Sequence, residues 1–234
     1  GAAGYNVLNA LAAAALAAAL DLPDEAIAAG LRSFRPTHED NPGRANLVEA
    51  GGVRVLLDYG HNPEGIRAVM SLVRHLRAER TPHGAVHVVL GQPGDRTDEA
   101  FLAVARAVME GAPDRIALFG YAHVPWMKPH QRLIDDASLP DAYARFRQFE
   151  AAAQALVAAD YARIGLDHFA KAGDALRVAC DNHTLKRNFQ GYTVDRAETL
   201  IGFGPSAISA FPQGYIQNAP DHAPWARAIG EGRL

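Results

Sequence analysis

The stretch "EGAPDRIALFGYAH", residues 110–123, decides how the chain is organised. Its apolar run at 116–119 is typical of a buried strand and lies between a helical segment and a Gly-Tyr-Ala-His turn. The motifs that precede this stretch and those that follow it point to different proteins. We therefore predict two segments of different origin, residues 1–110 and 111–234, which meet between residues 108 and 114.

The composition predicts a globular chain, and the expected partners are small-molecule ligands. Hydrophobic residues make up 49% of the 234 residues and charged residues 21%, which is enough for a core. The net charge of -3 gives no basic footprint for nucleic acid or for an anionic membrane. The single cysteine, Cys180, excludes an internal disulfide and an iron–sulfur cluster held by three or four thiolates of these residues.

The Ala-rich beginning of the chain does not predict a signal peptide. It has no positively charged start, and Asn6 and Asn9 interrupt its apolar run. No stretch reaches the ~18 apolar residues that a membrane span needs. We expect a soluble cytoplasmic protein, and the first residue, Gly1, is consistent with a fragment.

The first segment predicts helices at 6–20 and from Pro23 to just before Pro36. Buried strands are predicted at 53–60, 85–92 and 115–120, with helices between them. This alternation predicts an α/β fold with a parallel sheet covered by helices.

The regular alternation of predicted strands and helices ends after residue 123. A long helix is predicted within 139–160, a strand followed by a loop within 162–170, and a further helix within 173–185. Glycine- and aromatic-rich loops with short strands follow.

Three polar clusters stand out in the first segment. Asn6 and Asn9 share one helix face, Arg44 follows a glycine, and a strand ends in the group Asp58, Tyr59, His61 and Asn62. Arginine can bind a phosphate, asparagine can hydrogen-bond to a base edge, and aspartate can accept a hydrogen bond from a ribose hydroxyl. Tyrosine can provide a stacking surface. Together they would suit a nucleotide site at the carboxyl end of a strand.

Each cluster taken alone has a simpler explanation. Asn6 could cap its helix, Asp58 and Asn62 could form turns, and Arg44 could be a surface charge. The choice depends on the three clusters occurring in this order.

That order resembles the ATP-dependent Mur ligases, and most of all the ligase half of cyanophycin synthetases. The family's Asp-Tyr-Ala-His-Asn-Pro motif stands here at 58–63 with Gly60 for the alanine, and "LGQPGDRTDE" at 90–99 resembles its Gly-Asp-Arg turn. The resemblance implies a partial Rossmann-like sheet of the Mur C-terminal type and ATP with Mg. It assigns ATP contacts to Asn6, Asn9, Arg44, Asp58, Tyr59 and His61, and a substrate contact to Asn62.

The phosphate loop of that family is absent from these residues. Such a loop ends in Gly-Lys-Ser/Thr, whereas the only lysines here, Lys128, Lys171 and Lys186, lie in other contexts.

The second segment resembles oxygen-independent coproporphyrinogen III oxidases (coproporphyrinogen dehydrogenases) of porphyrin biosynthesis. Tyr-Ala-His-Val-Pro, Asp-His-Phe-Ala and Arg-Asn-Phe-Gln-Gly-Tyr-Thr occur in that order. The resemblance implies the C-terminal part of a radical S-adenosylmethionine partial β/α barrel, with S-adenosylmethionine and a [4Fe–4S] cluster as cofactors. It assigns S-adenosylmethionine contacts to Ala122 and Ile208, and a carboxylate-rich tetrapyrrole pocket to His123, Arg187, Asn188 and Gln190.

The alternatives are again structural. Ala122 and Ile208 could be core residues. The four polar residues, His123, Arg187, Asn188 and Gln190, could form a hydrogen-bond network that stabilises a loop. Asp167 and His168 are not expected to form a catalytic pair, because the sequence supplies no nucleophile for them to activate. His83 and His87 are not expected to form a metal site, because His87 lies in a predicted strand.

We therefore interpret the chain as an α/β chimera. Its leading function is a coproporphyrinogen dehydrogenase fragment, inactive because the cluster cysteines are absent. The alternatives are a Mur-type amide ligase fragment or a non-catalytic nucleotide-contacting module. A gene fusion, a rearranged reading frame and an assembled sequence would all give this pattern. Incomplete sheet faces predict marginal stability, self-association and no single cooperative unfolding transition.

Overall fold

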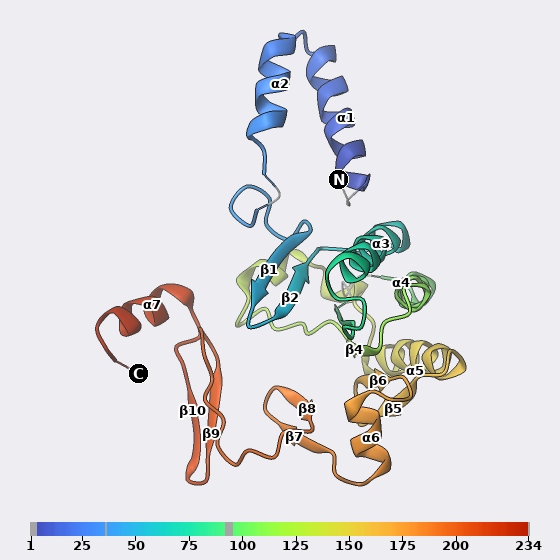
Figure 1. Cartoon of the computed structure of the whole chain (residues 1–234), viewed down its shortest axis with the longest axis vertical. Coiled ribbons are helices and arrows are strands. Elements are labelled where there is room, and N and C mark those ends of the chain that lie inside the picture. The colour runs from blue at the N-terminus through green and yellow to red at the C-terminus, as the bar shows by residue number, and fades with distance from the viewer. Residues whose placement is uncertain (1–3, 36, 92–95, 234) are drawn as a thin grey trace. The chain divides into compact units, whose positions relative to one another are not determined.

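The computed structural model describes residues 4–35, 37–91 and 96–233 (Figure 1). The chain divides into two compact units, an N-terminal unit of residues 1–172 and a C-terminal unit of residues 173–234. The fold is mixed α/β, as predicted.

The chain begins with a helical hairpin. Helix α1 (Gly4–Ala19) and helix α2 (Asp24–Ser33) lie side by side, which confirms both predicted helices (Figure 1). Pro23 is the N-cap of α2, and Asp24 and Glu25 occupy its first turn, where negative charge suits the helix dipole. Neither helix has a buried residue among those described.

Strand β1 (Asn46–Ala50) and strand β2 (Val53–Leu57) form a two-stranded antiparallel hairpin. Gly51 and Gly52 link them with φ of 56° and 79°, the left-handed conformations that a tight hairpin turn requires. The prediction of a buried strand at 53–60 is wrong on burial. Within the described ranges β2 pairs only with β1, so its valines and leucines stay exposed or half-buried.

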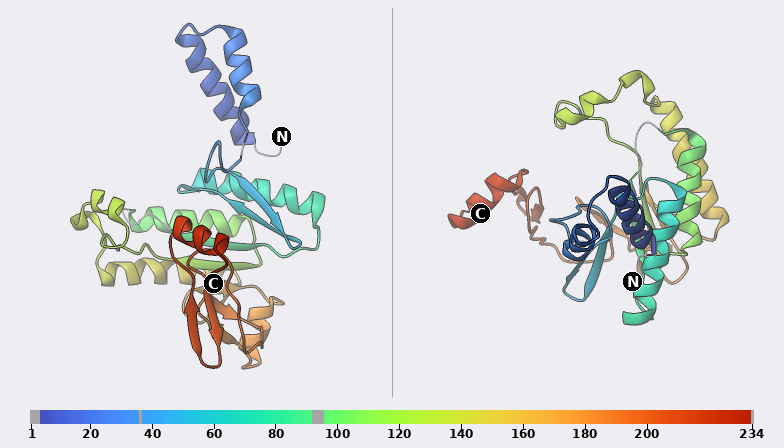
Figure 2. Two further views of the ribbon diagram at one scale, coloured as in Figure 1. Left: turned by 90° about the vertical axis from the view of Figure 1, so that its left-hand side faces the viewer. Right: turned by 90° about the horizontal axis from the view of Figure 1, so that it is seen from above.

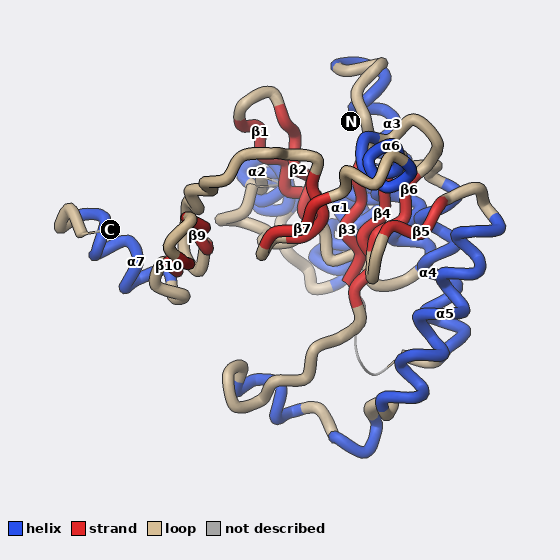
Figure 3. The backbone as a smooth tube through the Cα atoms, turned by 90° about the horizontal axis from the view of Figure 1, so that it is seen from below, coloured by secondary structure: helices blue, strands red, loops and turns tan. Residues whose placement is uncertain are grey.

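The central sheet has the strand order β3-β4-β6-β5 (Figure 3). Its members are β3 (His87–Gly91), β4 (Arg115–Phe119), β5 (Ala162–Ile164) and β6 (His168–Ala170). Only β3 and β4 are parallel, with Val89 opposite Ala117, whereas β6 and β5 add antiparallel strands. The predicted parallel sheet is thus reduced to one pair, and the stretch predicted as a strand and a loop forms two strands because the chain doubles back.

Three long helices lie next to one another in the N-terminal unit: α3 (Pro63–Arg80), α4 (Asp98–Glu110) and α5 (Ala142–Ala158) (Figure 2). Asn62, Thr97 and Asp141 cap their first turns through side-chain oxygens. Between β4 and α5 the chain forms two short 3-10 helices, η1 (Pro129–Leu133) and η2 (Asp136–Ser138).

One hydrophobic core holds this unit together, and both predicted segments contribute to it. Its largest members include Met70, Phe101, Leu118, Leu156 and Phe169. The compact units do not divide at residue 110, so the predicted boundary at 108–114 stays a prediction about the origin of the segments.

The C-terminal unit is built from short elements. They are α6 (Ala175–Asp181), the hairpin of β7 (Lys186–Asn188) and β8 (Gly191–Thr193), the hairpin of β9 (Ile208–Phe211) and β10 (Gly214–Gln217), and α7 (His222–Gly230). The short strands were predicted, and helix α7 was not.

Candidate functional site

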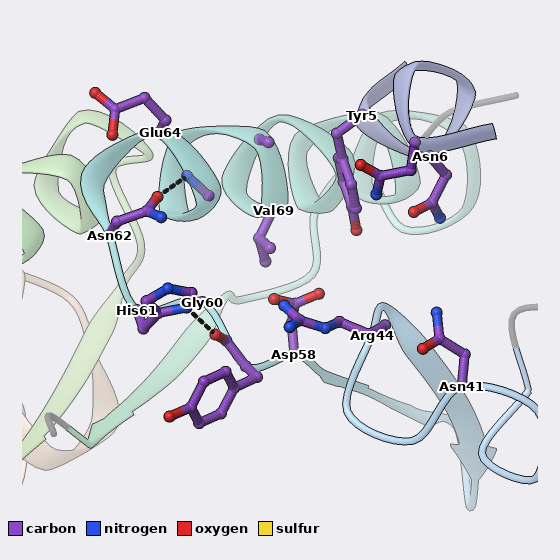
Figure 4. Close-up of a pocket in the computed structure, with 14 residues that line it drawn as sticks. Tyr5, Asn6, Asn41, Arg44, Asp58, Gly60, His61, Asn62, Glu64 and Val69 are labelled. Carbon is purple, nitrogen blue, oxygen red and sulfur yellow. Dashed lines mark hydrogen bonds between the residues drawn. The ribbon is translucent and has the colours of Figure 1, made fainter. Parts of the chain in front are cut away.

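A pocket of about 550 Å³ opens between the start of α1, the loop before β1, the end of β2 and the first turns of α3 (Figure 4). We call it the Arg44 pocket. It is lined by Tyr5, Asn6, Asn9, Asn41, Arg44, Asp58, Tyr59, Gly60, His61, Asn62, Glu64, Gly65, Ala68 and Val69. All six residues for which ATP contacts were predicted lie on its wall, together with Asn62.

The loop before β1 brings Arg44 to the pocket. Gly43 and Ala45 have φ of 72° and 52°, so the backbone turns through left-handed conformations on both sides of Arg44. The Ala45 conformation is unusual for a residue with a Cβ, and its N–H is held by Oδ2 of Asp58 at 2.9 Å. Asp58 therefore fixes the loop as well as facing the pocket.

Asn46 is a buried residue that orders the same loop, and sequence reasoning missed it. Its side-chain oxygen accepts from the Gly43 N–H at 2.6 Å, and its amide nitrogen donates to the carbonyl of Asn41 at 3.1 Å. A polar residue at the start of an apolar strand was the available signal.

Tyr59 and His61 also line the pocket. The Arg44 guanidinium lies 5.6 Å from the centre of the Tyr59 ring, and the Tyr59 N–H donates to the Gly43 carbonyl at 2.8 Å. Nδ1 of His61 lies 3.1 Å from the Tyr59 carbonyl oxygen, a hydrogen bond that needs the proton on Nδ1 (Figure 4). Tyr59 is largely exposed, and its ring also lies 5.2 Å from the His61 ring, centre to centre.

Asn62 has a structural task. Its Oδ1 accepts from the Gly65 N–H at 2.7 Å and caps α3, which is the turn-forming role left open by the sequence (Figure 4). A substrate contact would fall to its amide nitrogen and stays a prediction. At position 60, a Cβ would stand 2.8 Å from the Ile66 side chain, which fits glycine in place of the family's alanine.

Tyr5 also lines the pocket, although sequence reasoning did not single it out. Its ring points from α1 toward Asp58 and Arg44 (Figure 4). Its hydroxyl is buried and has no hydrogen-bond partner within the described part of the chain. Burial raises the pKa of Tyr5 above its usual value, and Asp58 raises it further while Arg44 lowers it.

The residues assigned to the second family lie in different units. Ala122 and His123 belong to the N-terminal unit, in the loop after β4, whereas Arg187, Asn188, Gln190 and Ile208 belong to the C-terminal unit. Their predicted contacts with S-adenosylmethionine and a tetrapyrrole stay predictions.

Gln131 orders the loop that carries Ala122 and His123. Its Oε1 accepts from the Val124 N–H at 2.6 Å, and its Nε2 donates to the Ala122 carbonyl at 3.0 Å. This buried glutamine was also missed by sequence reasoning. Nε2 of His123 lies 2.8 Å from Asp136 Oδ1 at an angle that makes no hydrogen bond, and its Nδ1 lies 3.3 Å from the Tyr121 hydroxyl.

In the C-terminal unit, the predicted polar residues form a local network. Oδ1 of Asn188 accepts from the N–H groups of Gln190 and Gly191, at 2.9 and 3.1 Å. Nε2 of Gln190 donates to the Ile208 carbonyl at 3.1 Å, and the Arg187 guanidinium lies 5.6 Å from the centre of the Tyr192 ring. The structure thus joins Gln190 to Ile208, through the loop-stabilising contacts that the sequence left open.

The residues present do not fit a [4Fe–4S] cluster of the usual thiolate kind. Cys180 is the one cysteine of the sequence and lies on α6. In the part of the chain that the structure describes, no three His, Cys, Asp or Glu side chains gather in a way that could hold a metal ion. Across the same ranges, every helix is too short or too polar to cross a bilayer.

The Gly-Asp-Arg turn predicted at 90–99 falls partly outside the described residues. Residues 92–95 are not described, and Thr97 beyond them caps α4.

Curated relatives named coproporphyrinogen III oxidases match between about half and most of the chain. An oxygen-independent coproporphyrinogen III oxidase of Bradyrhizobium diazoefficiens is 44% identical over 171 residues, 73% of this chain and 37% of the relative. The enzyme of that name from Paracoccus denitrificans is 53% identical over 53% of this chain and 27% of the relative. An anaerobic coproporphyrinogen III oxidase of Cereibacter sphaeroides is 45% identical over 86% of this chain and 44% of the relative. The chain therefore spans less than half the length of each.

A solved structure agrees with these relatives. Coproporphyrinogen III oxidase from Escherichia coli, described as a radical SAM enzyme, superposes with a TM-score of 0.61 at 34% identity. The match covers 71% of this chain and 38% of that one. The predicted likeness to part of a radical SAM barrel is confirmed.

A family model described as "Mur ligase, glutamate ligase domain" matches residues 43–166, more than half of the chain. The match includes Arg44 and the Asp58–Pro63 motif and continues past the predicted junction into α5. Both predicted resemblances are therefore confirmed. The chain belongs to the Mur ligase family and is also similar to oxygen-independent coproporphyrinogen III oxidases, which is consistent with a chimera of both.

Proposed function

We propose that the chain acts as a non-catalytic nucleotide-contacting module, and that the Arg44 pocket is its binding site. The observation that carries the proposal is the convergence of three sequence clusters. Asn6 and Asn9 come from α1, Arg44 from the loop before β1, and Asp58 from the end of β2, yet all line one pocket.

The chemistry of the wall suits the parts of a nucleoside. The amides of Asn6 and Asn9 offer donors and acceptors to a base edge. The exposed ring of Tyr59 offers a stacking surface, and Asp58 keeps Oδ1 for a ribose hydroxyl while Oδ2 accepts from Ala45.

Affinity for ATP should be low, because these residues lack the Gly-Lys-Ser/Thr loop whose amides and lysine hold phosphates. Arg44 is the one cation on the described wall of the pocket. We expect a dissociation constant no tighter than about 1 mM, which corresponds to about 4 kcal/mol of binding free energy.

The test is a titration of the 234-residue chain with ATP, followed by NMR. Saturable binding in the millimolar range that Arg44→Ala weakens supports the proposal, and Arg132→Ala, whose side chain lies outside the pocket, serves as the matched control. Micromolar affinity abolished by Arg44→Ala would contradict the weak-binding claim, and no saturable binding of either ATP or adenosine would refute the module.

A second proposal concerns the later part of the chain. Relatives that match 53% and 73% of the chain are named coproporphyrinogen III oxidases, so we propose that the later part derives from such an enzyme and, within these 234 residues, performs no radical chemistry. The support is the single cysteine. A Mur-type amide ligase activity is the remaining alternative, and it would need a phosphate loop that these residues lack.

A further inference from the structure

We infer that the Arg44 pocket selects an uncharged ribonucleoside over a nucleoside triphosphate, and that the Tyr5 hydroxyl and the Asp58 carboxylate together contact the ribose diol. The inference rests on the proposed function, because it takes the pocket to be a nucleotide site. It goes further by naming the ligand class and by adding Tyr5 to the contacts.

The Tyr5 hydroxyl is unsatisfied among the described residues. The Tyr5 oxygen is buried and, among the described residues, has no hydrogen-bond partner, although the tyrosine lines the pocket. An unpaired buried hydroxyl destabilises a protein, and a ligand hydroxyl would remove that cost. A tyrosine can both donate and accept, so it suits a sugar hydroxyl.

The carboxylate of Asp58 is a neighbour of the Tyr5 hydroxyl. Tyr5 points toward Asp58, which is close enough to raise the tyrosine pKa (Figure 4). Oδ2 of Asp58 already accepts from the Ala45 N–H, so Oδ1 remains for a ligand. A vicinal diol presents two hydroxyls, and the carboxylate can accept from one while Tyr5 bonds to the other.

The charges on the pocket wall favour a neutral ligand over a triphosphate. The described wall carries one cation, Arg44, against the two carboxylates of Asp58 and Glu64. Glu64 is exposed and lies 3.8 Å from Arg67, so its repulsion is screened, whereas Asp58 is half-buried. The wall has no surplus of positive charge for a triphosphate, and a neutral nucleoside keeps the base and ribose contacts without the repulsion.

The experiment compares the affinities of two proteins for three ligands in Mg-free buffer. The native chain and Tyr5→Phe are titrated with adenosine, 2′,3′-dideoxyadenosine and ATP, and binding is followed by NMR. Tyr143→Phe, an exposed tyrosine on α5 outside the pocket, is the control for a tyrosine-to-phenylalanine change.

The native chain is expected to bind adenosine about 3- to 10-fold more tightly than dideoxyadenosine, the effect of one or two hydrogen bonds. Tyr5→Phe should lose most of that preference by weakening adenosine alone, and Tyr143→Phe should keep it. ATP should bind no more tightly than adenosine.

Two results would overturn the inference and leave the proposed function standing. The first is adenosine binding with no preference over dideoxyadenosine, or with a preference that survives in Tyr5→Phe. The second is ATP binding more tightly than adenosine. If none of the three ligands binds, the proposed function itself fails.

Discussion

Val86 and Asp114 exchange two hydrogen bonds across the predicted junction of the two segments. The Val86 N–H donates to Oδ2 of Asp114 at 2.7 Å, and the Asp114 N–H donates to the Val86 carbonyl at 2.8 Å. The Asp114 carbonyl in turn accepts from the Lys171 N–H at 3.0 Å. One residue at the junction therefore bonds to strand regions on both sides of it.

Replacing Asp114 should loosen the N-terminal unit. Asp114→Ala leaves the Val86 N–H without its side-chain acceptor, so the free energy of unfolding should fall by about 1–3 kcal/mol. Denaturant unfolding measures the change. Asp221→Ala, at an N-cap that makes no side-chain hydrogen bond, is the control and should change it by under about 0.5 kcal/mol. Equal effects of the two substitutions would mean that the junction contact is unimportant.

Tyr161 should make stability fall at high pH. Its hydroxyl donates to the Pro113 carbonyl at 2.6 Å, and burial, with Asp114 as the lesser cause, raises the pKa of Tyr161 to about 12. The contribution is complete below the unfolded value near 10 and is lost as pH rises through about 12, because the unfolded chain loses the proton first.

Tyr161→Phe should therefore unfold more easily at neutral pH and lose less stability between pH 10 and 12 than the native chain. Urea unfolding at pH 7, 10 and 11.5 tests both statements. A native-like slope in the variant would show that Tyr161 is not the titrating group.

Reconstitution with iron and sulfide under anaerobic conditions should give no stable [4Fe–4S] cluster, because Cys180 is the only thiolate. Visible and paramagnetic resonance spectra are the measurement, and Cys180→Ser should match the native chain. A stable cluster signal together with reductive cleavage of S-adenosylmethionine would overturn the proposal that these residues perform no radical chemistry.

Self-association through α1 is expected, because this helix exposes Leu8, Leu11 and Leu16 and has no charged residue. Size-exclusion chromatography at two concentrations should show an oligomer that Leu11→Glu with Leu16→Glu dissociates. Leu133→Glu changes an exposed leucine elsewhere and should leave the oligomer intact. A monomer at both concentrations would contradict the expectation.

Elements with a strong local pattern could be predicted from the sequence. Helices α1 and α2 and strand β4 follow apolar spacing and a helix-starting proline, and the structure has them near the predicted bounds. The exposure of β2 could not be predicted, because burial depends on which strands pair with it and not on its own residues. The same limit applies to β5 and β6, whose three-residue strands depend on pairing with β4.

The pocket could be predicted where three motifs share a family order, since that order placed Asn6, Arg44 and Asp58 in one site. The roles of Tyr5 and Asn46 could not be predicted, because neither residue belongs to a recognisable chemical pattern in the sequence. Tyr5 matters through an unpaired hydroxyl, and Asn46 through burial among loop carbonyls, and both features exist only in the folded chain.

The most direct test of the account is NMR mapping of the adenosine contacts on the isotope-labelled chain. Saturable shifts are expected at the amides of Tyr5, Asn6, Asn9, Arg44 and Asp58, with residues 173–233 unchanged. Shifts confined to residues 173–233, or no saturable shift at the Arg44 pocket, would contradict it.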